Sequence, residues 1–163
     1  EGEMPKAPSL RILTQFIKDL SFENPSYTDS ARSTKPPNID LGIHVQARTI
    51  SQDTYEVTLN FSARAVNESE DVVFIAELAY SGLFQMANIT EADREPFLLI
   101  ECPRMIFPFA RRVLADITRD GGFPPLMLDP VDFANLYRAQ MAKRAAAAQG
   151  AETNGNGEPS AAN

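Results

Sequence analysis

The stretch at residues 71–86, "DVVFIAELAYSGLFQM", is apolar on both of its alternating faces for much of its length. A strand with one face in water carries polar residues at every second position, so this pattern predicts a long strand covered on both sides. We expect one face to meet a core and the other to meet another subunit. Gly82 inside the run is typical of a bulge or bend in a long strand.

Two segments before this stretch predict neighbouring antiparallel strands. Residues 54–66, "TYEVTLNFSARAV", alternate between apolar and polar, and turn residues flank them on both sides. From Asn38 onward the alternation is strict, with four apolar residues on one face: Ile39, Leu41, Ile43 and Val45. The segment from Leu10 to Phe22 spaces its apolar residues in a way that fits a helix as well as a strand, and the residues alone leave both open.

The second half of the chain has helical periodicity. Pro108 suits the first turn of a helix whose apolar residues recur until Gly121 and Gly122 end it. A last helix is predicted to begin with Asp129 as its cap and Pro130 in its first turn. Strands followed by helices predict an α+β fold, with a small antiparallel sheet and helices packed on one face.

The length of 163 residues suits one domain. Large apolar residues are scarce at both ends, where the composition is typical of disorder. We therefore expect a flexible N-terminus at residues 1–8, an ordered domain at residues 9–144 and a disordered tail at residues 145–163.

Composition and charge argue against several classes of partner. A formal net charge of −7 disfavours nucleic-acid binding, which depends on clustered Lys and Arg. No apolar run approaches the ~20 residues that span a bilayer, so we expect no direct membrane insertion. The first residues lack the pattern of a signal peptide, and a single cysteine forms no internal disulfide, so we expect a cytoplasmic location.

The sequence also lacks a recognisable catalytic constellation. The one histidine, His44, has no evident nucleophile beside it, and Cys102 lies in an apolar context where a thiol acts as a small hydrophobe. Neither a phosphate-binding loop nor metal-spaced Cys and His residues are present in the sequence. We expect no enzymatic activity, no cofactor and no metal, and the surplus of apolar positions favours a role in assembly and binding.

Four short motifs of the second half occur together in a fixed order and spacing. They are Cys102-Pro103, Phe107-Pro108-Phe109-Ala110-Arg111, Gly122-Phe123-Pro124-Pro125 and Leu128-Asp129-Pro130-Val131-Asp132-Phe133. Each motif is weak by itself, but the set resembles the signature of SecB, the bacterial protein-export chaperone family. The resemblance extends to "KDLSFENP" at 18–25, "YEVTL" at 55–59 and "FIAELAYSGLF" at 74–84, and so covers nearly all of residues 10–141.

The resemblance implies a four-stranded antiparallel sheet whose first strand starts near Leu10, with helices on one face and a homotetramer built as a dimer of dimers. It also implies a function: ATP-independent binding of unfolded secretory preproteins, which are then delivered to the motor SecA. An alternative is a dedicated SecB-like chaperone or interaction module that serves a single partner.

Family motifs assign two sets of site residues. SecA binding falls on Asp19, Glu23, Ile75 and Glu77. From the residues alone, an edge charge that blocks unwanted strand pairing is the favoured explanation of Glu77, and the resemblance reverses this preference. The client-binding groove falls on residues that the pattern alone assigns mostly to a core: Ile39, Leu41, Ile43, Phe123, Pro124, Tyr137 and Met141.

Overall fold

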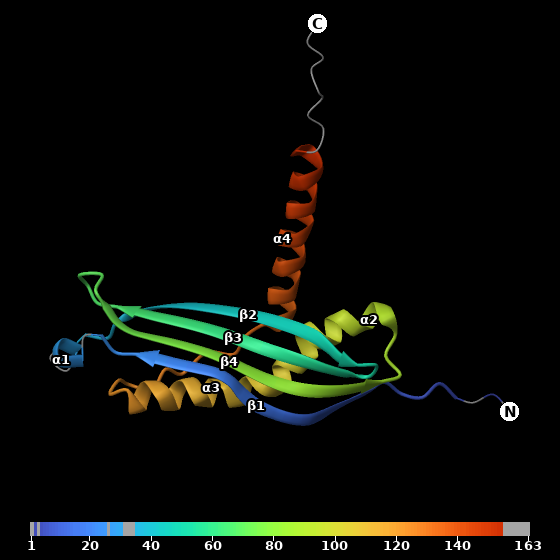
Figure 1. The fold of residues 1–163 in the computed structure, drawn as a ribbon, viewed down its shortest axis with the longest axis horizontal. Helices are drawn as coiled ribbons and strands as arrows, with labels where there is room; N and C mark the ends of the chain where they lie inside the picture. The colour runs from blue at the N-terminus through green and yellow to red at the C-terminus, as the bar shows by residue number, and fades with distance from the viewer. Residues whose placement is uncertain (1, 3, 26, 31–34, 155–163) are drawn as a thin grey trace, which may run out of the picture. The chain divides into compact units, whose positions relative to one another are not determined.

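The computed structural model describes residues 2, 4–25, 27–30 and 35–154. The chain forms two compact units, residues 1–130 and residues 131–163, and each is described by itself. The first unit contains an antiparallel sheet of four strands in the order β1-β4-β3-β2, together with helical segments (Figure 1). Its elements are β1 (Ser9–Glu23), α1 (Tyr27–Ser30), β2 (Asn38–Ser51), β3 (Thr54–Val66), β4 (Val72–Ala87), α2 (Glu91–Pro96), a π-helical turn (Phe97–Glu101) and α3 (Cys102–Asp120). The second unit contains α4 (Phe133–Asn154).

The predicted α+β class is confirmed, and the long apolar stretch is the interior strand β4, hydrogen-bonded to β1 and β3. The segment from Leu10 is strand β1, as the family resemblance implied. Its helix-like spacing has a physical cause. The pairing of β1 with β4 shifts register between Ile12 and Thr14 and again between Ile17 and Asp19, and each extra residue displaces the two-residue alternation by one.

Helix α3 covers one face of the sheet. On that face the side chains at alternate positions of β3 and β4 are buried, and on α3 Ile106, Ala110 and Leu114 are fully buried against them. The rings of Phe61 and Phe107 lie 6.3 Å apart across this interface. The remaining alternate positions form the opposite face, which we call the polar face. On β2 and β3 it carries Asp40, Gly42, His44, Gln46, Arg48, Glu56, Thr58, Asn60, Ser62 and Arg64.

Gly82 does not mark the bulge that the sequence predicted. It pairs in register with both Gln15 and Val57, so β4 continues through it without interruption. A Cβ atom there would lie 2.7 Å from the ring of Phe84 and 3.2 Å from Ile106. The glycine therefore makes room for the packing of α3. The register shifts of β4 lie elsewhere, at two points of its pairing with β1 and at Val73 near its start.

The first long helix begins earlier than predicted. Pro108 lies inside α3, whose first turn carries Pro103. The helical path already starts at α2, where the hydroxyl of Thr90 accepts a hydrogen bond from the backbone N–H of Asp93 at 3.2 Å. A threonine followed three residues later by a carboxylate is a capping signal, and the sequence analysis missed it.

The segment after α3 is held in place by specific contacts. Gly122 has a φ of +92°, which disfavours any residue with a side chain, and a Cβ at Gly121 would collide with the ring of Phe22. Phe123 packs on Phe74, with ring centroids 4.9 Å apart. The two glycines thus end the helix and let the chain pass closely over the end of the sheet.

A buried hydroxyl fixes the continuation of this segment. Thr118 is fully buried, and its Oγ1 donates to the carbonyl of Leu114 at 2.8 Å. The same oxygen accepts from the backbone N–H of Leu126 at 2.9 Å. The backbone carbonyl of Thr118 also accepts from Phe123 N–H at 3.0 Å, so one residue orders both ends of the turn.

Helix α4 begins later than predicted. It starts at Phe133, and Asp132 rather than Asp129 is its cap, because Asn135 N–H donates to Asp132 Oδ1 at 3.0 Å. The helix continues past residue 144 to Asn154. The proposed flexible ends at residues 1–8 and 145–163 stay predictions, and residues 155–163 lie outside the described part of the chain.

We predict that Thr118→Val lowers the free energy of unfolding by roughly 1–3 kcal/mol, because it leaves the Leu126 N–H without its acceptor. Chemical denaturation followed by circular dichroism measures the change. Thr118→Ser keeps the hydroxyl and is the control. Equal stability of the valine and serine variants would contradict the role of the hydroxyl.

Candidate functional site

The four predicted docking residues lie in three successive cross-strand rows of the polar face, on β1 and β4. Glu23 lies opposite Ile75, and Ser21 lies opposite Glu77. Asp19 follows in the next row, opposite Ala79. The three carboxylates are exposed and Ile75 is half-buried. Residues from two separate segments thus form one surface, which we call the acidic patch.

A shallow hollow of about 440 Å³ adjoins the acidic patch and extends across the sheet toward β2. It exists because three of its central positions are small: Gly42 is paired with Ser62, and Ala79, opposite Asn60, lies in the next row. Its rim carries polar side chains, namely Asp19, His44, Asn60 and Glu77. Two carboxylates and no Lys or Arg are among the residues that line it.

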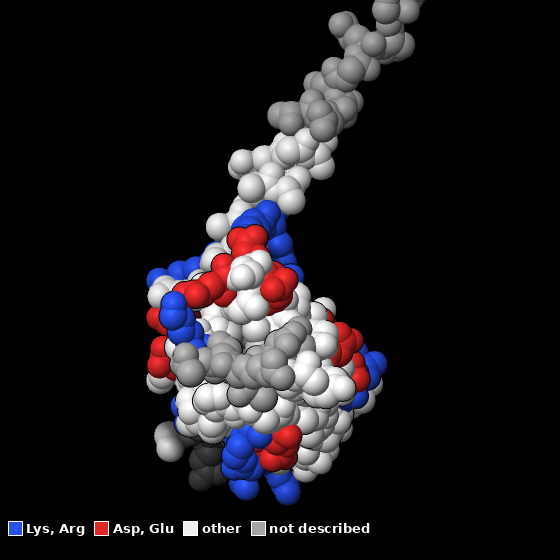
Figure 2. All heavy atoms as spheres, turned by 90° about the vertical axis from the view of Figure 1, so that its left-hand side faces the viewer, with Lys and Arg blue, Asp and Glu red and all other residues white. Residues whose placement is uncertain are grey.

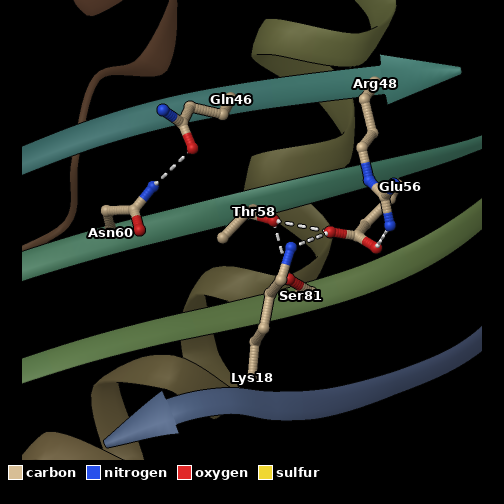
Figure 3. A network of polar contacts seen from close by, with 7 residues as sticks. All are labelled: Lys18, Gln46, Arg48, Glu56, Thr58, Asn60 and Ser81. Carbon is tan, nitrogen blue, oxygen red and sulfur yellow. Dashed lines mark hydrogen bonds and ion pairs between the residues drawn. The ribbon is translucent and has the colours of Figure 1, made fainter.

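A network of polar contacts borders this region, and Glu56 is its centre (Figure 3). Its carboxylate accepts from Lys18 Nζ at 2.6 Å and from Arg48 at 2.9 Å. The side chain of Glu56 is only 7% exposed. Hydrogen bonds from Arg48 and then Lys18 lower the pKa of this carboxyl to about 2.

The same network joins all four strands. Lys18 comes from β1 and Arg48 from β2, so the ion pairs connect the two edge strands to β3. Between them the hydroxyls of Thr58 on β3 and Ser81 on β4 lie 2.7 Å apart. The contacts therefore tie the polar face together along a line across the strands.

Despite the formal net charge of −7, the surface at one end of the molecule is not uniformly acidic. Figure 2 shows the end of the molecule where β3 turns into β4, with groups of acidic and basic side chains separated by wide uncharged surface. Recognition of a charged partner therefore depends on where individual charges are placed rather than on the net charge.

The predicted client-groove residues of β2 lie on the opposite face of the sheet. Ile39 is 38% exposed, Leu41 and Ile43 are half-buried, and Val45 is buried. The exposure of these apolar side chains thus increases along the edge strand β2 from Val45 to Ile39. Because β2 pairs with β3 alone in this sheet, its outer edge offers unpaired backbone groups within the described part of the chain.

The other predicted groove residues are divided between the two units. Phe123 packs on Phe74, and Phe74 lies in the same cross-strand row as Ile39. Phe123 and Ile39 are therefore near the same end of the sheet. Pro124 is exposed beside it. Tyr137 and Met141 lie on α4 in the second unit, so they are not part of the arrangement around β2.

Cys102 is fully enclosed in the core. Burial, together with the nearby Glu101, raises the pKa of its thiol to about 12. The thiol is therefore protonated at neutral pH, in keeping with a packing role. The described residues contain no cluster of three or more metal-ligating side chains, and no helix among them is long and apolar enough to cross a membrane.

The sequence analysis missed Glu56, its two cationic partners and the hollow. A carboxylate at a polar position of a strand gives no sign of burial when read alone. Its partners are 38 and 8 residues away in sequence, and only strand pairing brings them together.

Comparison with known proteins identifies relatives over nearly the whole chain. The family model described as "Preprotein translocase subunit SecB" matches residues 3–144. The "Protein-export protein SecB" of Maricaulis maris is 69% identical over 97% of this chain and 92% of its own length. The protein of the same name from Hyphomonas neptunium is 52% identical over 96% of this chain and 91% of its own length.

The fold also matches a solved structure. It is that of a SecB-like chaperone of Mycobacterium tuberculosis in complex with a ChAD peptide from the HigA1 antitoxin. The TM-score is 0.60 at 16% identity, and the match covers 75% of this chain and 90% of the other. At this identity the likeness concerns the fold.

We predict that Glu56→Gln lowers the free energy of unfolding by about 2 kcal/mol at neutral pH. The pKa of Glu56 is about 2 in the folded protein, against an ordinary value of 4.5, so its contribution is complete above pH 4.5 and is lost as the pH falls toward 2. Denaturation of both proteins from pH 7 to pH 2 measures this difference, which should shrink across that window. A difference that does not change with pH would contradict the assignment.

Proposed function

Because this chain belongs to the SecB family of preprotein translocase subunits, we propose that it is an ATP-independent chaperone of the cytoplasm that keeps secretory preproteins unfolded and delivers them to SecA. The family is one of protein-export chaperones and not of enzymes. The observation that carries the delivery step is the meeting of Asp19, Glu23, Ile75 and Glu77 on one exposed patch.

The chemistry of the acidic patch suits a basic segment of a partner. Two of the three exposed carboxylates adjoin the half-buried Ile75, since Glu23 lies opposite it on β1 and Glu77 is two residues along β4, so the patch offers negative charge beside an apolar contact. Charge complementarity of this kind accelerates association and selects the partner. We assign the patch to the docking of SecA.

Client binding is assigned to the apolar stripe of Ile39, Leu41 and Ile43 on β2, with Phe123, Pro124, Tyr137 and Met141 as further contacts. An unfolded chain offers apolar side chains and unpaired backbone but no fixed shape. An edge strand with an apolar stripe supplies both kinds of contact. This arrangement supports binding of many unrelated sequences.

Assembly into a homotetramer is part of the same proposal. Large apolar side chains are exposed on β1 and α3, where Leu13 is 46%, Ile17 47% and Phe109 48% exposed. Obligate interfaces commonly exceed ~2,000 Å² and are rich in such residues. Contacts between copies of the chain would cover these side chains.

A dedicated chaperone for one partner is the second candidate function. It is favoured by the structural match to a SecB-like chaperone bound to a peptide from an antitoxin. The two candidates differ in the range of clients: a general chaperone binds several unrelated unfolded chains.

We predict that this protein arrests the refolding of a slow-folding secretory preprotein after dilution from denaturant, at one tetramer per client and without nucleotide. Recovery of client fluorescence or activity over time measures the arrest. Several unrelated unfolded preproteins should be held, and their folded forms should not bind. Capture of one partner alone would favour the dedicated chaperone.

We predict that Glu77→Lys weakens SecA binding about tenfold or more, because it reverses a charge in the acidic patch. Calorimetry or fluorescence anisotropy measures the affinity. Gln85→Lys adds the same lysine on the same strand, at an exposed position outside the patch, and serves as the control. Client arrest should be unchanged in both variants. An equal loss of client arrest would overturn the assignment of the patch.

A further inference from the structure

A bulge on β1 places Lys18 and Asp19 on the same face of the sheet. Regular alternation would direct consecutive residues to opposite faces. The register shift between Ile17 and Asp19 removes that alternation. Lys18 therefore reaches Glu56 on the polar face, while Asp19 lines the hollow on that same face. A cation thus lies next in sequence to a carboxylate of the acidic patch.

Glu56 holds this cation away from the patch. Lys18 Nζ lies 2.6 Å from one carboxylate oxygen of Glu56, and Arg48 lies 2.9 Å from the other. The heads of both cations are directed to Glu56 (Figure 3). Both cationic side chains are partly exposed, at 46% and 65%, so they have room to reach other acceptors. The nearest competing carboxylate on β1 is that of Asp19.

We propose that Glu56 is a positioning residue for the docking surface: by binding Lys18 and Arg48 it keeps the hollow beside Asp19 and Glu77 open for a lysine or arginine side chain of a basic partner segment. This inference rests on the proposed docking of SecA and names the feature of the partner that the surface recognises.

The shape and charge of the hollow suit such an occupant. Its floor is formed by small residues, and a Cβ added at Gly42 would meet only Ser62, at 3.9 Å. Its rim offers the carboxylates of Asp19 and Glu77 and the side chain of Asn60 as acceptors. A long side chain with a cationic head can therefore lie over this floor, on the face of the sheet, and bind at the rim.

Other charged groups on this face lie outside the hollow. Arg64 is opposite Ile75 and pairs across β3 and β2 with Asp40, one row beyond Ser62. Neither residue lines the hollow. The local balance of charge at its rim is therefore negative while Glu56 retains the two cations.

The first test fills the hollow. Gly42→Val places a branched side chain over its floor, where the Cβ atom meets nothing closer than Ser62, at 3.9 Å. Asn38→Val introduces the same side chain on the same strand and face, two rows from Gly42 and outside the hollow, and is the matched control. The probe is the basic C-terminal segment of SecA as a synthetic peptide, and its affinity is measured by fluorescence anisotropy. We expect a loss of about tenfold or more for Gly42→Val and less than twofold for the control.

The second test releases the cations. Glu56→Gln should weaken binding of the same peptide about tenfold, because Lys18 and Arg48 become free to neutralise the rim. Replacing both cations as well, in the triple variant Glu56→Gln, Lys18→Gln and Arg48→Gln, should restore the affinity to within about twofold of the parent protein. A purely structural role of Glu56 predicts no such rescue, and its absence would overturn the positioning role.

The outcomes separate this inference from the proposed function. If the parent protein does not bind SecA or its basic peptide, the proposed docking is wrong. If the parent binds and Glu77→Lys weakens binding while Gly42→Val has the affinity of its control, the docking stands and the hollow is not the binding site. A peptide with its Lys and Arg residues replaced by Gln should bind the parent weakly and be insensitive to Gly42→Val, and retained affinity would also overturn the inference.

Discussion

The packing of α3 against the apolar positions of β3 and β4 determines which face of the sheet is buried and which is left for binding. Fully buried side chains such as Leu59, Phe84 and Leu114 meet there and remove one face of the sheet from water. Because strand side chains alternate, burial of one set commits the intervening set to the other face. The polar face, with the acidic patch and the hollow, is therefore a direct consequence of the core.

The irregularities of the fold are as informative as its regular parts. Two bulges on β1 shift the alternation, and the second places Lys18 beside Asp19 on the polar face. A cation at that point would weaken an acidic docking surface unless another group bound it. Glu56 supplies that group at the centre of a network that crosses all four strands. Stability of the sheet and the charge of its surface thus depend on the same carboxylate.

The glycines and prolines after α3 have a similar double role. Gly121 and Gly122 allow the chain to pass over Phe22, and Thr118 anchors it through the N–H of Leu126. The ring of Phe123 is fixed on Phe74 while Pro124 stays exposed. A rigid, partly apolar segment is thereby held beside the sheet instead of collapsing onto it.

The sequence by itself determined the three regular strands β2, β3 and β4, the α+β class and, through its motifs, the membership of a chaperone family. Strict alternation over residues 38–46 and 54–66 identifies strands because the two-residue period is a local property of extended backbone. It misassigned the starts of α3 and α4. Pro108 and Asp129 each fit a local signal for a helix start, but in the folded chain the first-turn proline of α3 is Pro103 and the cap of α4 is Asp132. Tertiary structure alone decided the bulges of β1, the burial of Glu56 and the hollow beside the acidic patch. These features arise from the pairing of residues that are distant in sequence, and no local pattern records which carboxylate a given lysine will meet.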